Sequence, residues 1–460
     1  MTISVLDEVY LRTEEYQKVF SKKDRKDKAQ FFTSKQSAIK MADYLVCNQN
    51  EVVILEPGAG NGALTIAVVL KLISKGCKNI SCILIENDQN VIPLLTENIQ
   101  QIEKFSKDNN INFSAKIETS NFLLMDNIPS ADIAIMNPPY KKIRKDSQEA
   151  SKMKEFVFGQ PNLYSLFMGK TIQHLKENGE FVFIVPRSWT SGEYFKNTRQ
   201  YILNNTNIKN ICIFNDRDKA FSSENVLQET MIFSGYKNTT QSKNIKIDVY
   251  NDDTFSQKES FTILSNTIKN IGTNNYLLIP SKNKEVEILS KFSKSNKTFI
   301  DMGYEFKTGP VVEFRNKNEI SVSQKNNYVP MFRTANIING KLLFPIKQNK
   351  PQYVSVSADK LLLDNKNTIF VRRLSSKEEQ RRIQCCIYKA LNGQKYISVE
   401  NHVNYLTKKD KTKISNKELT DIYNLLMSEE YDLYFRLLNG STQVNAKELN
   451  NLPYIEDVLI

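Results

Sequence analysis

The chain has 460 residues, which is too long for one ordinary hydrophobic core, so its length predicts two or three domains. Hydrophobic residues make up 40% of it, and no apolar run approaches the roughly 18 to 20 residues that cross a bilayer, which excludes a helical membrane protein. The start of the chain lacks the pattern of a secretion signal, so we expect a cytoplasmic protein.

The net charge is +12 at pH 7, and a strongly basic chain favours a polyanionic partner. Residues 1–240 hold 30 Lys and Arg against 27 Asp and Glu, a net charge of +3. Residues 241–460 hold 33 against 24, a net charge of +9. We therefore expect the second half to make most of the contact with that partner.

Cysteine and histidine usage argues against a metal site. Six cysteines are scattered along the chain without a C-x-x-C pair, and only His174 and His402 are available to join them. The adjacent Cys385 and Cys386 fall in a segment that we expect to be helical, with one thiol buried and the other half-exposed. The sequence thus predicts no metal.

Residues 1–28 predict a charged helix whose basic end, 18–28, is more typical of a solvated face than of a strap across a phosphate backbone. From residue 51 onward, short apolar runs alternate with amphipathic stretches, which predicts βαβ units and a parallel sheet. The first predicted strands and helices are 52–55, 64–73, 81–85, 91–105 and 133–136.

The same alternation continues along the chain. Pro161 opens a predicted helix that Gly179 would cap, and a buried strand is predicted at 180–185. Further strand patterns lie at 211–214 and 230–233. These elements extend the predicted sheet.

Residues 237–244 are polar and turn-rich, and the alternation is lost beyond them. We place the domain boundary there, which gives domains at 1–240 and 241–460. The second domain has short mixed segments and, near its end, a predicted helix at 419–438 with an aromatic, apolar face.

Residues 54–63 predict a strand that runs into a glycine turn and then a helix. Glycine permits the sharp turn and lets a ligand approach the backbone closely. Gly58, Gly60 and Ala63 formally match a dinucleotide fingerprint, so a nicotinamide cofactor has to be weighed. Glu86 ends the next predicted strand, where a carboxylate could bind ribose hydroxyls of either kind of cofactor.

The tetrapeptide Asn137-Pro138-Pro139-Tyr140 directly follows the predicted strand 133–136. The Asn137 side-chain oxygen and the Pro138 carbonyl can accept the two protons of an amino group on an aromatic ring, and Tyr140 offers a flat surface for a planar base. Two acceptors would bend the nitrogen out of conjugation and aim it at an electrophile for direct in-line transfer, and the two prolines stiffen the loop. A methyl donor makes sense of these residues, whereas a nicotinamide or a simple proline-rich turn does not.

The tetrapeptide alone does not select the substrate. Adenine N6, cytosine N4, guanine N2 in RNA and the amide nitrogen of a protein glutamine are all conjugated nitrogens. A DNA-binding module with an inactive methyltransferase fold is another alternative, but it would require a broken site, and Gly58, Gly60, Glu86 and 137–140 are all present. The residues therefore predict N-methylation of one of these groups.

Taken together, the motifs resemble those of the S-adenosylmethionine-dependent amino methyltransferases of DNA, and more narrowly the gamma-class N6-adenine type, in which the cofactor motifs precede the catalytic motif. The resemblance implies a Rossmann-like α/β methyltransferase domain followed by a mixed α+β target-recognition domain. It also implies S-adenosylmethionine as cofactor, double-stranded DNA as partner, and extrusion of the target base, because the amine cannot reach the donor inside a duplex.

The resemblance also implies roles for single residues. Asn121 and Phe122 correspond to the adenine-binding motif, but the family usually has Asp where Asn121 stands, so an amide oxygen would bond the cofactor's adenine. Phe221 resembles the second aromatic that stacks on the extruded base, with a core position as the alternative, and Trp189 suits either the same edge or packing. The implied cofactor-binding set is Phe31, Phe32, Thr33, Glu56, Pro57, Gly58, Gly60, Glu86, Asn121, Phe122 and Asn137.

Three segments of the second half, 306–315, 372–382 and 439–446, resemble BsuBI/PstI-type modification methyltransferases, which act on adenine in a palindromic site. The likeness implies CTGCAG as a candidate target and a separately encoded cognate endonuclease as partner. Phosphate contacts need Lys and Arg, while base reading needs amides and arginines. A solvated helix face is the alternative for the arginine cluster, and a turn for the two amides. The DNA-binding candidates are Arg315, Arg372, Arg373, Lys377, Arg381, Arg382, Gln443 and Asn445.

Overall fold

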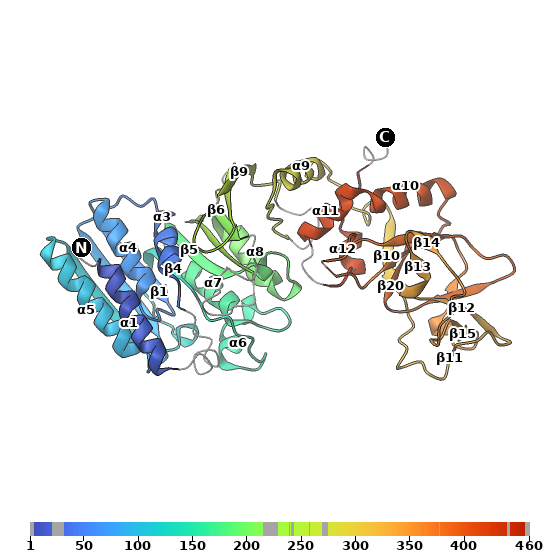
Figure 1. Cartoon of the computed structure of the whole chain (residues 1–460), viewed down its shortest axis with the longest axis horizontal. Coiled ribbons are helices and arrows are strands. Elements are labelled where there is room, and N and C mark those ends of the chain that lie inside the picture. The colour runs from blue at the N-terminus through green and yellow to red at the C-terminus, as the bar shows by residue number, and fades with distance from the viewer. Residues whose placement is uncertain are drawn as a thin grey trace. The chain divides into compact units, whose positions relative to one another are not determined.

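The computed structural model (Figure 1) describes residues 4–20, 32–214, 229–238, 240, 243–256, 258–268, 275–376, 378–438 and 442–455. The chain forms two compact units, Met1–Asn266 and Thr267–Ile460. Each unit has its own sheets and its own core. Across the described ranges, no helix combines the length and the apolar character needed to cross a bilayer.

Among the described residues, the first unit is built on one sheet of nine strands in the order β3-β2-β1-β4-β5-β7-β6-β8-β9. The strands from β3 to β5 run parallel, whereas β7 lies antiparallel between β5 and β6. The strand order reverses between β1 and β4, which is where ligands bind in open α/β sheets. The strands are β1 (Glu51–Pro57), β2 (Asn79–Glu86), β3 (Asn112–Thr119), β4 (Ala131–Met136), β5 (Leu175–Pro186), β6 (Thr206–Phe214), β7 (Thr230–Lys237), β8 (Asn244–Tyr250) and β9 (Glu259–Leu264).

Helices cover this sheet on both faces (Figure 1). Val52, Ile54, Ile133 and Ile135 are buried in one core cluster with the apolar helix α4, while Ala134, between the two isoleucines, is buried as well. Parallel strands that are buried on both faces need continuous apolar runs. These strands could therefore be predicted from the sequence. The helices are α1 (Val5–Val19), α3 (Lys35–Asp43), α4 (Ala63–Ser74), α5 (Ile92–Asp108), α6 (Gln148–Lys152), α7 (Leu163–Gln173) and α8 (Lys196–Asn205), with 3-10 turns η1 (Phe122–Leu124), η3 (Arg187–Thr190) and η4 (Glu193–Phe195).

The predicted α/β class is confirmed, with two local differences in the first unit. The N-terminal helix α1 ends at Val19 because Phe20 adopts an extended backbone, and the basic residues 21–31 lie outside the described part of the chain. The prediction that Gly179 caps a helix is wrong, since α7 ends at Gln173 and Gly179 lies inside β5. A Cβ on Gly179 would stand 2.9 Å from the Lys176 carbonyl oxygen, so glycine fits the irregular start of this strand.

The domain boundary lies later than residue 240. Strands β8 and β9 continue the sheet of the first unit, and β8 pairs in parallel with β6. Ile245, Ile247 and Val249 of β8 are buried, and so are Asp248 and Tyr250. The polar stretch 237–244 is therefore a connection between two strands of one sheet, and the unit extends to Asn266.

The second unit is a mixed α+β structure, as predicted (Figure 1). Its described residues form sheets in the orders β10-β20-β17-β18 and β11-β15-β12-β19-β16, and the hairpin β13-β14. The strands are β10 (Tyr304–Thr308), β11 (Ile320–Ser321), β12 (Tyr328–Phe332), β13 (Ile337–Ile338), β14 (Lys341–Leu342), β15 (Tyr353–Ser355), β16 (Leu363–Asp364), β17 (Thr368–Arg372), β18 (Cys385–Tyr388), β19 (Tyr396–Val399) and β20 (Val403–Lys408). The helices are α9 (Asn283–Phe292), α10 (Asn416–Met427), α11 (Glu429–Leu438) and α12 (Ala446–Asn450).

Two expectations for this unit need correction. Cys385 and Cys386 lie in strand β18, not in a helix, and both thiols are buried. Cys386 packs in an aromatic core with Phe332 and Tyr388, and a short apolar run cannot by itself distinguish a buried strand from a buried helix. The predicted helix 419–438 is two helices, because Ser428 between α10 and α11 has an extended backbone.

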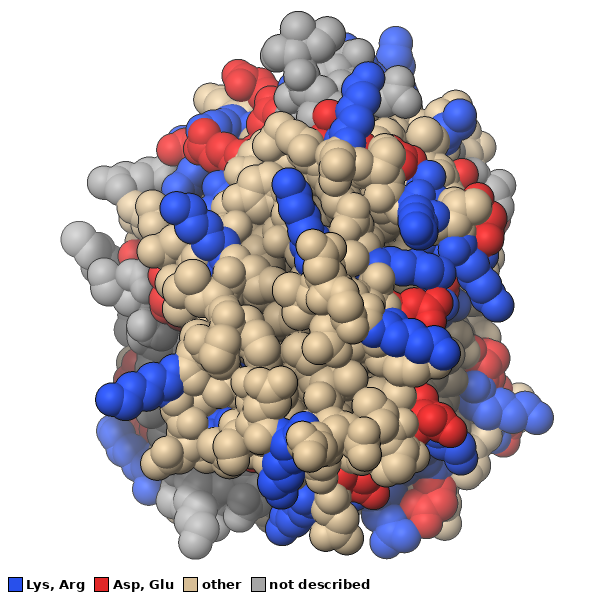
Figure 2. Space-filling view, turned by 90° about the vertical axis from the view of Figure 1, so that its right-hand side faces the viewer, with Lys and Arg blue, Asp and Glu red and all other residues tan. Residues whose placement is uncertain are grey.

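Figure 2 looks onto the second unit. Lys and Arg side chains stand on several sides of an uncharged central area, with fewer acidic side chains between them. Residues 267–460 contain 30 Lys and Arg against 20 Asp and Glu, a net charge of +10. The basic excess is thus a property of this unit, and on this face it is spread over the surface instead of forming one stripe.

Candidate functional site

The loops that follow β1 and β2 meet at one edge of the sheet. The backbone N–H groups of Gly58 and Ala59 donate to the Ile85 carbonyl at 2.7 and 3.1 Å. Pro57 is the last residue of β1, so the glycine loop begins at the carboxyl end of that strand. The loop is therefore held against the end of β2, where Glu86 lies.

The glycine loop requires glycine at its bends. Gly58 and Gly60 have φ angles of +72° and +53°, which L side chains rarely adopt. A Cβ on Gly60 would stand 3.6 Å from the ring of Phe32, and a Cβ on Gly58 would stand 3.9 Å from Pro139. The loop thus lies between Phe32, one of the predicted cofactor-binding residues, and the tetrapeptide.

Glu86 ties these loops together. One carboxylate oxygen accepts the Gly60 N–H at 2.9 Å, and the other accepts the N–H groups of Asn87 and Asp88 at 2.8 Å each. A carboxylate offers about four acceptor positions. Its orientation is therefore set by the backbone, and it retains capacity for a further hydroxyl donor.

Glu56 is a buried acid behind the loop. It is 2% exposed, and one of its oxygens accepts from both the backbone N–H and the hydroxyl of Thr65, at 3.0 and 2.5 Å. Burial, reinforced by the negative charge of Glu86, raises the pKa of Glu56 to about 8. A cation bound nearby would favour ionised Glu56.

Asn137 is held by a residue that is distant in the sequence. Its side-chain Nδ2 donates to the Thr33 hydroxyl at 3.0 Å, and its Oδ1 accepts the Tyr140 hydroxyl at 2.7 Å. Thr33 is itself buried, and its carbonyl accepts the Tyr10 hydroxyl at 2.8 Å. Helix α1 thus fixes Thr33, and Thr33 contacts the amide of the tetrapeptide.

Tyr140 is packed edge-on against a second tyrosine. Its ring centroid lies 6.1 Å from that of Tyr164 at an interplanar angle of 83°, and its hydroxyl also lies 3.1 Å from the Ile184 carbonyl. Burial raises the pKa of Tyr140, so the hydroxyl stays protonated and donates. Asn137 is partly exposed, so its side chain can be reached, whereas Pro138 is buried.

Asn121 and Phe122 lie at the turn η1 after β3. The Asn121 oxygen accepts the Leu123 N–H at 3.1 Å, and its Nδ2 donates to Glu149 at 2.9 Å. Phe122 is 2% exposed, and Lys170 lies 5.3 Å from its ring centroid. The Asn121 oxygen predicted to bond a cofactor's adenine is therefore already engaged by its own turn.

Lys170, which belongs to none of the predicted motifs, stabilises the turn η1. It is 4% exposed, and its ammonium donates to the carbonyls of Leu123 and Met125 at 3.0 and 2.5 Å. Burial lowers the pKa of Lys170 to about 8. The sequence gives no sign that a lysine in an apolar helix bonds the carbonyls of a distant turn.

Other predicted residues of the first unit have different outcomes. Phe31 and Phe221 lie outside the described residues. Trp189 is fully buried with its ring 5.0 Å from Phe233, so it serves packing.

In the second unit, the arginine cluster divides into buried and surface residues. Arg382 is 0% exposed, with its guanidinium 5.6 Å from the Phe435 ring, so its prediction as a DNA contact is wrong. Arg381 donates to the Ser428 carbonyl at 2.8 Å, and Arg372 bonds Gln384. Lys377 is outside the described residues, and the described neighbours form a turn instead of the alternative helix face.

Arg373 belongs to a different surface. Its N–H donates to the His402 carbonyl at 2.8 Å, and its guanidinium donates to the Asn401 carbonyl at 3.1 Å and to the exposed Gln443 at 3.4 Å. Its carbonyl accepts the Val444 N–H at 2.7 Å. Two segments about 70 residues apart in sequence therefore meet at the connection between β19 and β20.

The segment 306–315 reaches the same connection. The Asn401 N–H donates to the Val311 carbonyl at 2.8 Å, and the Thr308 hydroxyl donates to Asn404 at 3.0 Å. Asn404 in turn donates to the Val444 carbonyl at 2.7 Å. All three segments singled out in the sequence thus converge on residues 400–404.

A buried ion pair underlies this convergence. Arg333 and Glu400 are each 4% exposed and 3.2 Å apart, Glu313 bonds Arg333 at 2.7 Å, and His402 lies 2.9 Å from Glu400 with a half-exposed side chain. Sequence reasoning missed Asn401 and His402, because a short connection between strands carries no motif. Asn445, a predicted base contact, is the N-cap residue of α12 and donates its N–H to Glu448.

Arg315 lies at the surface beside an exposed aromatic ring. Its guanidinium is 5.3 Å from the ring centroid of Phe314, which is 69% exposed. Such a pair presents a charge and a flat apolar face together.

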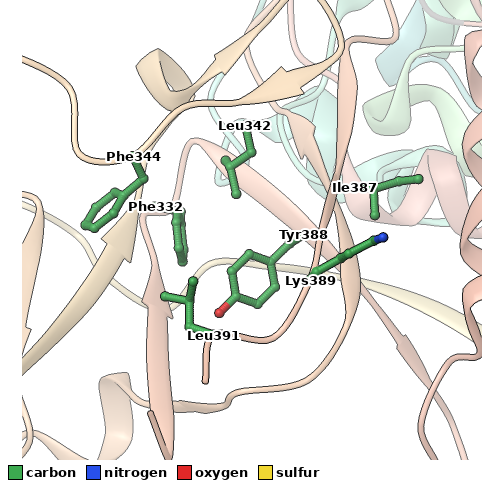
Figure 3. Close-up of a pocket in the computed structure, with 7 residues that line it drawn as sticks. All are labelled: Phe332, Leu342, Phe344, Ile387, Tyr388, Lys389 and Leu391. Carbon is green, nitrogen blue, oxygen red and sulfur yellow. The ribbon is translucent and has the colours of Figure 1, made fainter. Parts of the chain in front are cut away.

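The pocket in Figure 3 belongs to the core of the second unit. It has a volume of about 370 Å³, and its aromatic walls Phe332 and Tyr388 are each 1% exposed. Its lining is mainly apolar and lacks the acceptor pattern of the tetrapeptide: Phe332, Leu342, Phe344, Ile387, Tyr388, Lys389 and Leu391.

The chain is similar to known restriction-modification proteins. Residues 63–221 match the family model of the Eco57I restriction-modification methylase. The type II methyltransferase M.BsuBI of Bacillus subtilis is 32% identical over 95% of this chain and 90% of its own length. M.PstI of Providencia stuartii is 31% identical over 92% of this chain and 86% of its own length.

Among solved structures, one similar protein is the methyltransferase subunit of a type I restriction-modification system from Streptococcus thermophilus. It is 17% identical, covers 58% of this chain and 53% of its own, and has a TM-score of 0.37. The family assignment follows from the sequence relatives, which match over nearly their whole length. The chain belongs to the BsuBI/PstI family of type II DNA methyltransferases of restriction-modification systems.

Proposed function

We propose that the protein is a cytoplasmic, site-specific methyltransferase that moves a methyl group from S-adenosylmethionine to N6 of an adenine extruded from duplex DNA. The observation that carries the proposal is the contact of Asn137 with Thr33 and Tyr140, beside the glycine loop. It brings an amine acceptor, a stacking ring and the predicted cofactor motifs to one edge of the sheet.

The residues at this edge fit S-adenosylmethionine. Buried Glu56, whose pKa is about 8, suits a cationic ligand, and the methionine end of the cofactor is cationic. Glu86 retains capacity for one ribose hydroxyl, and Gly60 is partly exposed. When bound, the cofactor supplies an electrophilic methyl group on a sulfonium. Phe32, Thr33 and Phe122 would complete the cradle, with Phe31 and Asn121 as the further predicted contacts.

The tetrapeptide would activate the amine. The Asn137 oxygen and the Pro138 carbonyl accept one N–H each, which favours a tetrahedral nitrogen with its lone pair aimed at the methyl group. The Tyr140 hydroxyl donates to the Asn137 oxygen at 2.7 Å, and this oxygen has a second lone pair that can accept the incoming amine. Tyr140 then stacks on the base, with Phe221 proposed on its other side.

Adenine is favoured over cytosine, RNA or a protein glutamine by the motif order and by the family. The relatives are named type II methyltransferases, and an enzyme of this class modifies DNA. The basic second unit, net +10, suits a polyanion better than a protein loop. A cognate endonuclease encoded nearby is proposed on the same family grounds.

For base reading we propose the surface around residues 400–404. The Arg373 guanidinium can donate to the edge of a guanine, and the Gln443 amide can donate to and accept from the edge of an adenine. His402 and Arg315 lie on the same unit. CTGCAG is the candidate target. The Arg373→Ala protein is expected to lose sequence discrimination while retaining cofactor binding.

Expression in methylation-deficient cells, followed by single-molecule sequencing of the DNA, tests the proposal. We expect N6-methyladenine at one short site; unmodified adenine throughout would refute the proposal, and N4-methylcytosine would redirect it. The Asn137→Ala protein should still bind S-adenosylmethionine in calorimetry, yet leave DNA unmodified. Retained methylation would remove Asn137 from the mechanism.

A further inference from the structure

The segment that follows the tetrapeptide is strongly basic and has no assigned role. Lys141, Lys142, Arg144 and Lys145 are all exposed, and the acid next to them, Asp146, is bonded to Arg144. The loop 141–146 therefore carries a net charge of +3. At no more than about 3.6 Å per residue, the backbones of all four basic residues lie within about 18 Å of the Tyr140 backbone.

This loop is fixed in place by the segment 157–163. The Leu163 N–H donates to the Lys141 carbonyl at 2.8 Å, and the Ile143 N–H donates to the Pro161 carbonyl at 3.1 Å. The Gln160 side chain donates to the Ile143 carbonyl at 2.6 Å. The basic loop is thus presented in a defined position next to the catalytic tetrapeptide.

Exposed aromatic rings adjoin the same segment. Phe158 is 37% exposed and Tyr194 is 54% exposed, although large aromatic side chains are usually buried. The Tyr194 ring lies against Gly159, where a Cβ would be 2.3 Å from the ring, and Lys196 is 5.8 Å from the Phe158 centroid. The Tyr194 ring is therefore held at the surface by packing against Gly159, and the Phe158 ring lies beside the Lys196 ammonium.

The exposed rings also connect to the candidate site. Phe195, next to Tyr194, is 5.2 Å from Tyr164, which in turn packs edge-on against Tyr140. The Asn197 side chain donates to the Val157 carbonyl at 3.1 Å. One continuous set of contacts thus runs from the tetrapeptide to the outer rings.

We propose that the loop 141–145 and the pair Phe158 and Tyr194 form the contact for the DNA strand that carries the target base. The four cations bind the phosphates that flank the extruded nucleotide, and the rings offer a flat apolar face to a neighbouring base. The charge of these segments suits a polyanion, since residues 141–146, 157–163 and 193–197 together contain five basic residues and two acids: Lys141, Lys142, Arg144, Lys145 and Lys196, with Asp146 and Glu193. The inference rests on the proposed action on DNA and assigns to the first unit a strand contact additional to base reading in the second.

Salt dependence of DNA binding tests the cations. The variant K142Q/K145Q is compared with K104Q/K107Q, which removes two exposed lysines from α5. Binding of a labelled duplex is followed by anisotropy at several salt concentrations. The logarithm of the binding constant falls linearly with the logarithm of the salt concentration, and each lost phosphate contact makes this slope less steep by about 0.9. The slope should therefore become less steep by about 2 in K142Q/K145Q and should hardly change in the control. Equal slopes in the two variants would overturn the proposal.

The rings are tested with 2-aminopurine at the target position. Tyr194→Ala should reduce the fluorescence increase on binding, while Tyr194→Phe, which keeps the ring, should retain it. An unchanged increase in Tyr194→Ala and Phe158→Ala would remove the rings from the contact. Calorimetry with S-adenosylmethionine checks that each variant is folded. If the parent protein itself does not methylate or bind DNA, the proposed function fails, whereas a binding parent with unaltered variants refutes only this contact.

Discussion

The amide of Asn137 is bonded on both sides, to Thr33 through its nitrogen and to Tyr140 through its oxygen. A side-chain amide can rotate, and its two ends differ in what they can accept or donate. With the nitrogen directed to Thr33, the oxygen is the end presented on the side of Tyr140. Asn137, one of the four residues of the predicted catalytic tetrapeptide, thus depends on two hydroxyls for its orientation.

The raised pKa of Glu56 predicts how the stability of the protein depends on pH. Its pKa is raised from 4.5 to about 8 in the folded, cofactor-free protein, so the folded state holds more protons than the unfolded state between these values. The free energy of unfolding should therefore fall as the pH rises from about 4.5 to 8, by an amount on the order of a few kcal/mol at about 1.4 kcal/mol per pKa unit. Urea denaturation at several pH values measures this.

The Glu56→Gln protein should lose most of that pH dependence, because glutamine remains neutral. The exposed acid Glu103 on α5 provides the control, and Glu103→Gln should behave as the parent. An equally steep pH dependence in Glu56→Gln would show that another group is responsible. Affinity for S-adenosylmethionine in the parent should rise with pH through about 8, as Glu56 ionises.

Among the elements, helix α1 and the start of α4 support the glycine loop. The Asn61 side chain in this loop donates to the Thr13 hydroxyl of α1 at 2.8 Å, and Asn98 of α5 donates to the Asn61 carbonyl at 2.8 Å. Gly62 then begins α4 with a φ of +76°. The loop is therefore bounded by three helices, and hydrogen bonds to α1 and α5 hold Asn61.

Gly62→Ala and Gly76→Ala form a matched pair for this element. Both glycines have a positive φ, but a Cβ on Gly62 would stand 2.8 Å from the buried Leu95 side chain, whereas a Cβ on Gly76 meets nothing within 4 Å. Both changes should destabilise by about 1 kcal/mol from the backbone, and Gly62→Ala by about 1 to 3 kcal/mol more from overpacking. Equal losses in urea denaturation would contradict the packing argument.

For the whole molecule, the extent of the first unit can be tested by fragments. A fragment of residues 1–266 keeps β8 and β9, whereas a fragment of residues 1–240 removes them and exposes the edge of β6. Unpaired edges associate, and the buried face of β8 would be lost. The longer fragment should unfold cooperatively and bind S-adenosylmethionine, with weak DNA affinity.

The shorter fragment should aggregate or unfold at lower urea. Light scattering and circular dichroism distinguish the two outcomes. Identical urea midpoints for both fragments would mean that β8 and β9 contribute nothing to the first unit, and the boundary near residue 240 would then stand.

The local features of the candidate site could be predicted from the sequence. The strand that enters the glycine loop and the strand that ends at Asn137 are contiguous apolar runs followed by residues with specific backbone and hydrogen-bonding chemistry. Such runs are decided by neighbouring residues, and parallel strands place their carboxyl ends at one edge of the sheet. The α/β class and the methyltransferase family could therefore be predicted.

Only the tertiary structure decided which distant residues meet. Thr33 bonds Asn137 across 104 residues, Arg373 reaches the surface beside Gln443 while Arg382 is buried, and Cys385 lies in a strand. A charged side chain reads the same in the sequence whether it is solvated or buried with a partner. Its position depends on which apolar faces pack together, and that is settled by long-range burial over the whole unit instead of by any local pattern.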